Sequence, residues 1–133
     1  NIMKSAIKEN NIKVTIVIKN NIKINGSKNE YLQVLINILS NAKDEILAKQ
    51  IKDPVIMIKL YSKKGYSILE IEDNAGGIKI EPIEKVFEPF FTYKKQNGTG
   101  IGLFMSKLII DNNMNGKLSV ENKEKGASFR IIV

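Results

Sequence analysis

Residues 27–49, which read SKNEYLQVLINILSNAKDEILAK, predict one long helix. Ser27 and Glu30 have the spacing of a capping box, in which the two side chains satisfy the first free N–H groups of a helix reciprocally. The apolar positions that support this helix include Leu32, Leu35, Ile36, Leu39 and Ile46. The other elements of the fold are placed around it.

The sequence before this helix predicts a short helix and a strand. Residues 2–9 have apolar side chains at helical spacing, and residues 12–19 alternate with the period of a half-buried strand. Residues 20–21 are typical of a turn. Residues 22–24 then predict a short returning strand that stops at residues 25–26.

The sequence after the long helix predicts four strands and one more helix. The strands lie at residues 55–61, 66–73, 117–121 and 127–133, and the helix at about residues 102–112. The first two strands are joined by a short glycine turn, which indicates an antiparallel hairpin. Residues 74–99 have little periodicity, and this segment is longer than a simple connecting loop usually is, so it indicates a functional loop. This order predicts a two-layer α/β sandwich.

The composition excludes several kinds of function. The chain has 133 residues, which fits one domain, and contains no cysteine and no histidine. It therefore offers no disulfide, no thiolate or imidazole metal ligand, no cysteine nucleophile and no phosphohistidine. The apolar runs are too short to span a bilayer, and the start does not resemble a signal peptide. Because the chain begins at Asn1, we expect it to be a piece of a longer protein.

The charge of the chain is +7, from 21 basic and 14 acidic residues. Arg130 is the single arginine, and the lysines are scattered along the sequence. Base recognition and bidentate phosphate contacts favour arginine, so we do not predict binding to nucleic acid. We interpret the lysines as a solvated surface that can also attract a polyanionic ligand.

Two asparagines, Asn37 and Asn41, lie one turn apart on the same face of the predicted long helix. Asparagine is a poor helix former because its amide competes with the backbone for hydrogen bonds. The presence of two asparagines inside a helix therefore suggests that their side chains have a specific role. One interpretation is that the amides bond to a neighbouring loop. The other is that they offer oxygen to Mg²⁺, which takes few protein ligands and keeps phosphates and water.

Two glycine-containing segments have features of a nucleotide site. Residues 72–78, EDNAGGI, place the carboxylate of Asp73 at the end of a strand, beside a backbone that a ligand can approach closely. The amine of adenine would suit this carboxylate, and a simple turn is the alternative. Residues 98–103, GTGIGL, lead into a helix with unobstructed N–H groups, which favours phosphate.

Residues 86–94, VFEPFFTYK, lie between those two segments. Three phenylalanines around a proline indicate a loop that is attached by aromatic packing, either as a plug in the core or as the hinge of a mobile lid. Lys94 or Lys95 would then be available to a polyphosphate.

In order and spacing, these segments resemble the N, G1, F and G2 boxes of the ATP-binding domain of bacterial sensor histidine kinases. The boxes correspond to residues 36–44, 73–78, 87–94 and 98–103, and residues 115–129 also follow the family. The resemblance covers essentially the whole chain. It implies a single domain over residues 1–133 with a Bergerat-type fold: a mixed, mostly antiparallel five-stranded sheet with about three helices on one face and ATP on the helical side.

The resemblance also implies residue roles. Asn41 would bind Mg²⁺, and Asn37 would support the phosphates from the turn before; Asp73 would accept a hydrogen bond from the adenine amine, and Gly77 would let the base sit close. The implied catalytic residues are Asn37, Asn41 and Lys94, and the implied nucleotide-binding residues are Asn41, Asp73, Gly77, Ile78, Phe87, Lys94, Gly98, Thr99, Gly100, Ile101, Gly102 and Leu103.

Two positions depart from the family pattern. Ala75 stands where the G1 box usually has glycine, which should stiffen the turn without removing the contact of Asp73. Asp44 stands where several relatives carry a basic residue that faces the phosphates, and Lys43 is expected to point elsewhere on the helix.

Hydrolytic members of the same superfamily carry a glutamate one turn before the magnesium asparagine, where this chain has Asn37. An amide cannot accept a proton from water, so the resemblance implies phosphoryl transfer rather than hydrolysis. The implied function is transfer of the γ-phosphoryl group of Mg-ATP to a histidine. Two alternatives stay open: an anti-sigma-factor-type serine kinase, and a nucleotide-binding regulatory domain without catalysis.

The phosphoacceptor histidine would lie on a separate dimerising helical domain of the same protein. The implied partners are therefore ATP, that helical domain and, through it, a response regulator. Alone, the chain is expected to bind Mg-ATP without phosphorylating itself. We expect this piece to be a cytoplasmic monomer, and the full-length protein to be a homodimer that is often anchored in a membrane.

Overall fold

The computed structural model describes residues 2–19, 23–24, 26–89 and 101–133. Within these residues, five strands form one mixed sheet in the order β1-β2-β3-β5-β4. The strands are β1 (Lys13–Ile18), β2 (Val55–Lys63), β3 (Tyr66–Asp73), β4 (Lys117–Asn122) and β5 (Ala127–Ile132). The helices of the described part are α1 (Ile2–Glu9), α2 (Lys28–Ala48) and α3 (Gly102–Leu108), with a 3-10 helix η1 (Ile83–Phe87) and a π-helical turn η2 (Ile109–Asn113).

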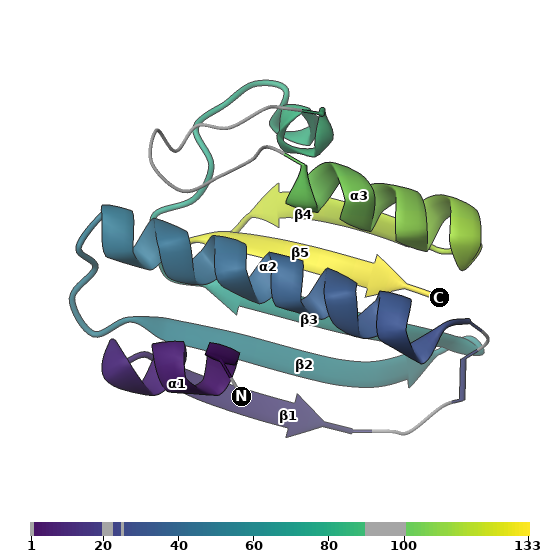
Figure 1. Ribbon diagram of the computed structural model, residues 1–133, viewed down its shortest axis with the longest axis horizontal. Coiled ribbons are helices and arrows are strands. Elements are labelled where there is room, and N and C mark those ends of the chain that lie inside the picture. The colour runs from purple at the N-terminus through teal and green to yellow at the C-terminus, as the bar shows by residue number, and fades with distance from the viewer. Residues whose placement is uncertain (1, 20–22, 25, 90–100) are drawn as a thin grey trace.

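The helices α1, α2 and α3 cover one face of the sheet, which gives the predicted two-layer sandwich (Figure 1). Strand β1 pairs with β2 in parallel, and the other neighbouring strands of the sheet are antiparallel. Because a parallel pair needs a crossover connection, α2 carries the chain across the sheet from β1 to β2. The hairpin of β2 and β3 turns at Lys64 and Gly65, which both have positive φ, the geometry that matches the twist of two-residue hairpins.

Helix α2 begins and ends close to the predicted boundaries. The Ser27 hydroxyl accepts a hydrogen bond from the backbone N–H of Glu30 at 3.2 Å, which is the Ser27 half of the predicted capping box. The Glu30 carboxylate accepts a hydrogen bond from the Asn113 side chain at 2.9 Å, so it ties the start of α2 to the end of η2. Lys49 is the C-cap of the helix.

The face of α2 toward the sheet includes only part of the apolar positions that predicted the helix: Ile46 is buried, and Leu35 and Leu39 pack against the core. Val34, Ile38, Ala42 and Ile46 are buried, whereas Leu32 and Ile36 are 44% and 46% exposed. The buried residues are spaced by four positions, so they form one stripe toward the sheet. Apolar residues surround most of the first half of this helix, and for that reason the sequence did not define which stripe would be buried.

The predicted returning strand at residues 22–24 is wrong at the positions that can be described. Lys23 and Ile24 lie in no strand, and residue 22 is outside the described residues, as are residues 20–21 and 25. The physical reason is the pairing of β1, whose hydrogen-bonded neighbour is β2 on the far side of the α2 crossover. The described residues between β1 and α2 therefore form no returning strand.

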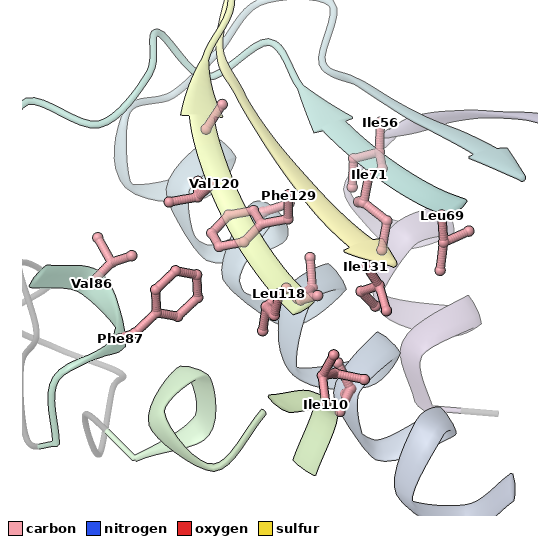
Figure 2. Packing of buried hydrophobic residues seen from close by; sticks show 14 of the residues in the cluster. Ile56, Leu69, Ile71, Val86, Phe87, Ile110, Leu118, Val120, Phe129 and Ile131 are labelled. Carbon is pink, nitrogen blue, oxygen red and sulfur yellow. The ribbon is translucent and has the colours of Figure 1, made fainter. Parts of the chain in front are cut away.

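The hydrophobic core lies between the helices and the sheet (Figure 2). Phe129 of β5, 2% exposed, contacts Phe87 in an edge-to-face arrangement with ring centroids 6.1 Å apart. The ammonium group of Lys107 lies 5.4 Å from the centroid of the same Phe87 ring. Aromatic packing therefore attaches Phe87 to the body of the fold, as the sequence predicted, whereas Phe90 and Phe91 lie outside the described residues.

Candidate functional site

A small hollow lies where the second half of α2 meets the loop that follows β3. Its lining residues are Asn41, Glu45, Asp73, Ala75, Gly77, Ile78 and Ala127. The structure thus brings together Asn41, Asp73, Gly77 and Ile78, four of the predicted site residues. The empty space between these residues is about 190 Å³, and part of it is open to solvent. The hollow is therefore too small to enclose a nucleotide, and a base would lie against its edge.

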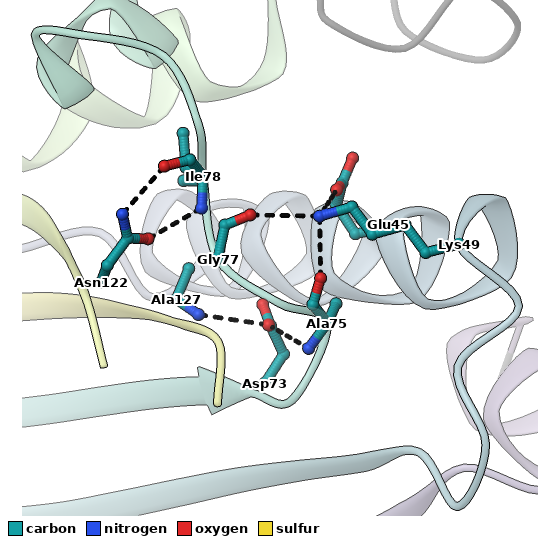
Figure 3. A network of polar contacts seen from close by, with 8 residues as sticks. All are labelled: Glu45, Lys49, Asp73, Ala75, Gly77, Ile78, Asn122 and Ala127. Carbon is teal, nitrogen blue, oxygen red and sulfur yellow. Dashed lines mark hydrogen bonds and ion pairs between the residues drawn. The ribbon is translucent and has the colours of Figure 1, made fainter. Parts of the chain in front are cut away.

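Asp73 provides a fixed acceptor at the end of β3. It is 7% exposed, and its Oδ1 atom accepts hydrogen bonds from the backbone N–H of Ala75 at 3.0 Å and of Ala127 at 3.3 Å (Figure 3). The two bonds come from different segments of the chain, so they fix the plane of the carboxylate. An ionised carboxylate only accepts hydrogen bonds, which suits a ligand with an N–H donor.

Lys49 holds the loop after Asp73 from the end of α2. Its ammonium group donates to the carbonyl oxygens of Ala75 at 2.8 Å and Gly77 at 3.1 Å, and it forms an ion pair with Glu45 at 3.1 Å (Figure 3). Gly76 and Gly77 have φ values of 85° and 84°, which directs these carbonyls toward α2 at no steric cost.

Asn122 holds the same loop from the end of β4. Its side chain accepts from the backbone N–H of Ile78 at 2.7 Å and donates to the Ile78 carbonyl at 2.8 Å (Figure 3). A Cβ atom at Gly77 would lie 2.8 Å from the Asn122 Oδ1 atom. The glycine at 77 therefore leaves room for the asparagine, in addition to its positive φ.

Asn37 lies against the start of α3. Its Nδ2 atom donates to the Gly102 carbonyl at 3.2 Å and to the Ser106 hydroxyl at 3.0 Å. Its Oδ1 atom accepts a hydrogen bond from Gln33 at 3.1 Å. The structure thus brings Asn37 and Gly102 together, and the next residue, Leu103, packs against the core.

The other predicted site residues are placed as follows. Phe87 is buried in the core, and Ile101 is the N-cap of α3. Lys94, Lys95, Gly98, Thr99 and Gly100 lie outside the described residues.

The two departures from the family pattern are accommodated in the structure. Ala75 is 2% exposed and donates its N–H to Asp73, so alanine fits this turn. Asp44 forms an ion pair with Lys43 at 3.4 Å, so the two neighbouring charges of α2 compensate each other.

Three residues that organise the hollow were not predicted as site residues: Lys49, Asn122 and Gly126. A Cβ atom at Gly126 would lie 1.9 Å from the Asp73 carbonyl oxygen. No local pattern identifies these residues, because each contacts a loop that lies 26 to 53 positions away in the sequence.

Two features are absent from the part of the chain that the structure describes. None of its helices combines the length and the apolar character that a membrane span requires. Nor does this part hold a cluster of three or more acidic side chains that could bind a metal by itself.

A mixed five-stranded sheet lies under three helices and forms a two-layer sandwich, with Asp73 and Asn41 at one hollow. The chain belongs to the family of histidine kinase-, DNA gyrase B- and HSP90-like ATPases, whose sequence profile matches residues 26–133. The resemblance found in the sequence and the predicted fold class are confirmed, and ATP is the ligand of this family.

Sensor kinases are among the relatives of the chain. It is 38% identical over 111 residues to the signal transduction histidine-protein kinase AtoS of Escherichia coli, and 34% identical over 113 residues to the two-component sensor PprA of Pseudomonas aeruginosa. These matches cover 83% and 80% of this chain but only 17% and 12% of the two sensors. The chain therefore spans a small part of the length of these relatives.

Solved histidine kinase structures have the same fold. The catalytic domain of the histidine kinase ThkA, in a nucleotide-free form, matches with a TM-score of 0.85 and 28% identity over 99% of this chain and 84% of that chain. A structure of ThkA in complex with the response regulator protein TrrA matches with a TM-score of 0.79 and 27% identity, over 99% of this chain and 36% of that chain.

Replacing Asn122 by alanine is expected to weaken nucleotide binding about fivefold, because Ile78 loses both hydrogen bonds that fix it beside the hollow. Calorimetric titration with a non-hydrolysable ATP analogue measures this. Asn113→Ala is the matched control, since it removes a bond to Glu30 at the other end of α2. An equal loss of affinity in both variants would contradict the role of Asn122 in the site.

Proposed function

We propose that this chain is the catalytic, ATP-binding module of a two-component sensor histidine kinase. The observation that carries the proposal is the convergence of Asp73, Gly77 and Ile78 with Asn41 at one hollow, in a chain that contains no histidine. A phosphoacceptor histidine must then lie on another segment, which we take to be a dimerising helical domain of the same protein.

The adenine base is the part of the ligand that the hollow can recognise. Asp73 accepts a hydrogen bond from the adenine amine, and the Gly77 and Ile78 backbone borders the base. The phosphates extend toward Gly102 and Leu103. The proposal also includes the phosphate contacts predicted for Ile101, Gly98, Thr99, Gly100 and Lys94. Phe87, the first residue of the predicted F box, is buried in the core.

Magnesium is proposed at Asn41. The residue lines the same hollow as Asp73, and an amide oxygen is a hard ligand of the kind that Mg²⁺ accepts. A single protein ligand is sufficient, because Mg²⁺ usually keeps waters and binds the phosphates of its nucleotide. When bound, the ion would neutralise charge on the phosphates.

Phosphoryl transfer, rather than hydrolysis, is favoured by the residue at position 37. The Asn37 amide cannot accept a proton from water, and its nitrogen already donates to α3. In the proposed transfer, a bond forms between the histidine nitrogen and the γ-phosphorus, the bond to the bridging oxygen breaks, and ADP leaves. Such transfer depends mainly on positioning and charge neutralisation.

The partners follow from this reaction. The phosphohistidine domain would pass the phosphoryl group to a response regulator, the kind of protein that ThkA binds in its complex with TrrA. We propose that this piece is a monomer on the cytoplasmic side of the membrane. The longer protein would be a homodimer through its helical domain and would carry a membrane anchor.

The proposal is tested by mixing the chain with a separately produced histidine-bearing helical domain from a sensor kinase and ATP labelled at the γ-phosphate. We expect Mg²⁺-dependent, acid-labile label on the helical domain and none on this chain. Acid-stable label would indicate the serine kinase instead. Binding of a non-hydrolysable ATP analogue without any transfer would indicate the non-catalytic regulator.

A further inference from the structure

Three residues join helix α3 to helix α2, and we call them the Asn37–Ser106 cluster: Asn37, Gly102 and Ser106. The Ser106 hydroxyl donates to the Gly102 carbonyl at 2.8 Å, and the Asn37 amide donates to both oxygens at 3.0 and 3.2 Å. Ser106 is 0% exposed. The cluster therefore closes between two helices, with Ser106 as its buried member and Asn37 and Gly102 partly exposed.

The hydrogen bonds of the cluster require a donor at position 37. The Gly102 carbonyl can only accept, and the single Ser106 hydroxyl proton already points to Gly102. Asn37 thus faces two acceptors, and its NH₂ group donates a hydrogen bond to each of them. Gln33 donates to the Asn37 Oδ1 atom at 3.1 Å, which agrees with this orientation of the amide. An ionised carboxylate of the same size would offer these acceptors nothing.

The position of the cluster connects it to the proposed nucleotide site. Asn41 follows Asn37 by one turn of α2, on the same face of the helix. Gly102 is the first residue of α3 and ends the glycine-containing segment of residues 98–102. The cluster therefore sets how far the turn that carries Asn41 lies from the first turn of α3.

We propose that Ser106 is a positioning residue of the nucleotide site, and that Asn37 acts by donating to Ser106 and Gly102 rather than by contacting the phosphates. This inference rests on the proposed function, because it assigns Asn37 and Ser106 to the same ATP site. It takes Asn37 out of the group that touches the ligand and adds a residue to which the sequence motifs assigned no role.

The test compares Ser106→Ala, Asn37→Asp and the double variant with the unchanged chain. Each is titrated with a non-hydrolysable Mg-bound ATP analogue at a temperature where all are folded. We expect Ser106→Ala to weaken binding about fivefold and Asn37→Asp about tenfold or more. The double variant should bind no more weakly than Asn37→Asp, because the two residues act through one cluster. Additive losses would overturn the proposal.

Two controls separate positioning from mere stability. Ser67→Ala alters another buried serine, 3% exposed, at the far end of β3 from Asp73, and should leave the affinity unchanged. In the phosphotransfer reaction with the helical domain, Ser106→Ala should raise the KM for ATP while kcat changes less than about twofold, as expected when only ground-state binding is lost. A fall in kcat with unchanged KM would contradict the assignment.

Failure of this inference can be told from failure of the proposed function. If the unchanged chain binds no nucleotide, the function is wrong, and amide hydrogen exchange in α3 still tests the cluster. Ser106→Ala and Asn37→Asp should then both speed exchange at residues 105–108, Asn37→Asp the more, and the double variant should exchange no faster than Asn37→Asp. Unchanged exchange in either variant would refute the cluster itself.

Discussion

Replacing Asp73 by asparagine is expected to weaken binding of a non-hydrolysable ATP analogue about 100-fold or more, while the chain stays folded. The Asp73 Oδ1 atom accepts from the N–H groups of Ala75 and Ala127, and an amide oxygen can accept the same two bonds. Those bonds place the new NH₂ group where the second carboxylate oxygen was. This NH₂ group would then face the adenine amine, donor against donor. A lost bond to a charged group and an unpaired donor together amount to about 3 kcal/mol, which corresponds to about 100-fold.

Calorimetric titration of both chains measures this effect, and Glu72→Gln is the matched control. Glu72 precedes Asp73 on β3, so its side chain points to the opposite face of the sheet. Glu72→Gln removes the same charge as Asp73→Asn, but at a distance from the hollow. The affinity of the Glu72→Gln variant for the analogue should therefore stay within about twofold of that of the unchanged chain. If Asp73→Asn bound as tightly as Glu72→Gln, the adenine contact of Asp73 would be refuted.

The secondary structure was predictable because its signals are local. Residues 2–9 and 66–73 have the predicted boundaries of α1 and β3, and Ser27 caps α2 as expected. The choice of the buried stripe on α2 was not predictable in the same way. It depends on which side chains meet the sheet, and Leu32 and Ile36 are as apolar as the residues that do.

The candidate site was predictable to the extent that its residues lie in short motifs. Asp73 and Asn41 were identified from their own segments, and they meet at the hollow. Lys49 and Asn122 were not identified, because a lysine after a helix and an asparagine at a strand end have many ordinary uses. Their roles arise when the fold brings them to the carbonyls of the loop and to Ile78.

Replacing Gly126 by alanine is expected to destabilise the chain by about 3 kcal/mol and to displace Asp73, with loss of nucleotide binding. The added Cβ atom would lie 1.9 Å from the Asp73 carbonyl oxygen and 2.6 Å from its Oδ1 atom. Backbone cannot rotate away as a flexible side chain can, so the end of β3 must move. Gly126 is not among the glycines with positive φ, and the effect is therefore steric.

The matched control for the Gly126→Ala substitution is Gly116→Ala. There the added Cβ atom would lie 2.4 Å from the Ile132 carbonyl oxygen, which is comparable crowding against backbone. Gly116 precedes the end of β4 that pairs with Ile132, whereas Gly126 precedes Ala127 at the opposite end of the same strand pair. Urea unfolding should therefore show a loss of stability in both variants. Titration at a temperature where both are folded should show a loss of affinity in Gly126→Ala alone, because the crowding there acts on the carboxylate that we propose to recognise the base. If Gly126→Ala and Gly116→Ala bound the analogue equally well, the end of β3 would have relaxed without displacing Asp73. The expected effect of Gly126 on the site would then be refuted.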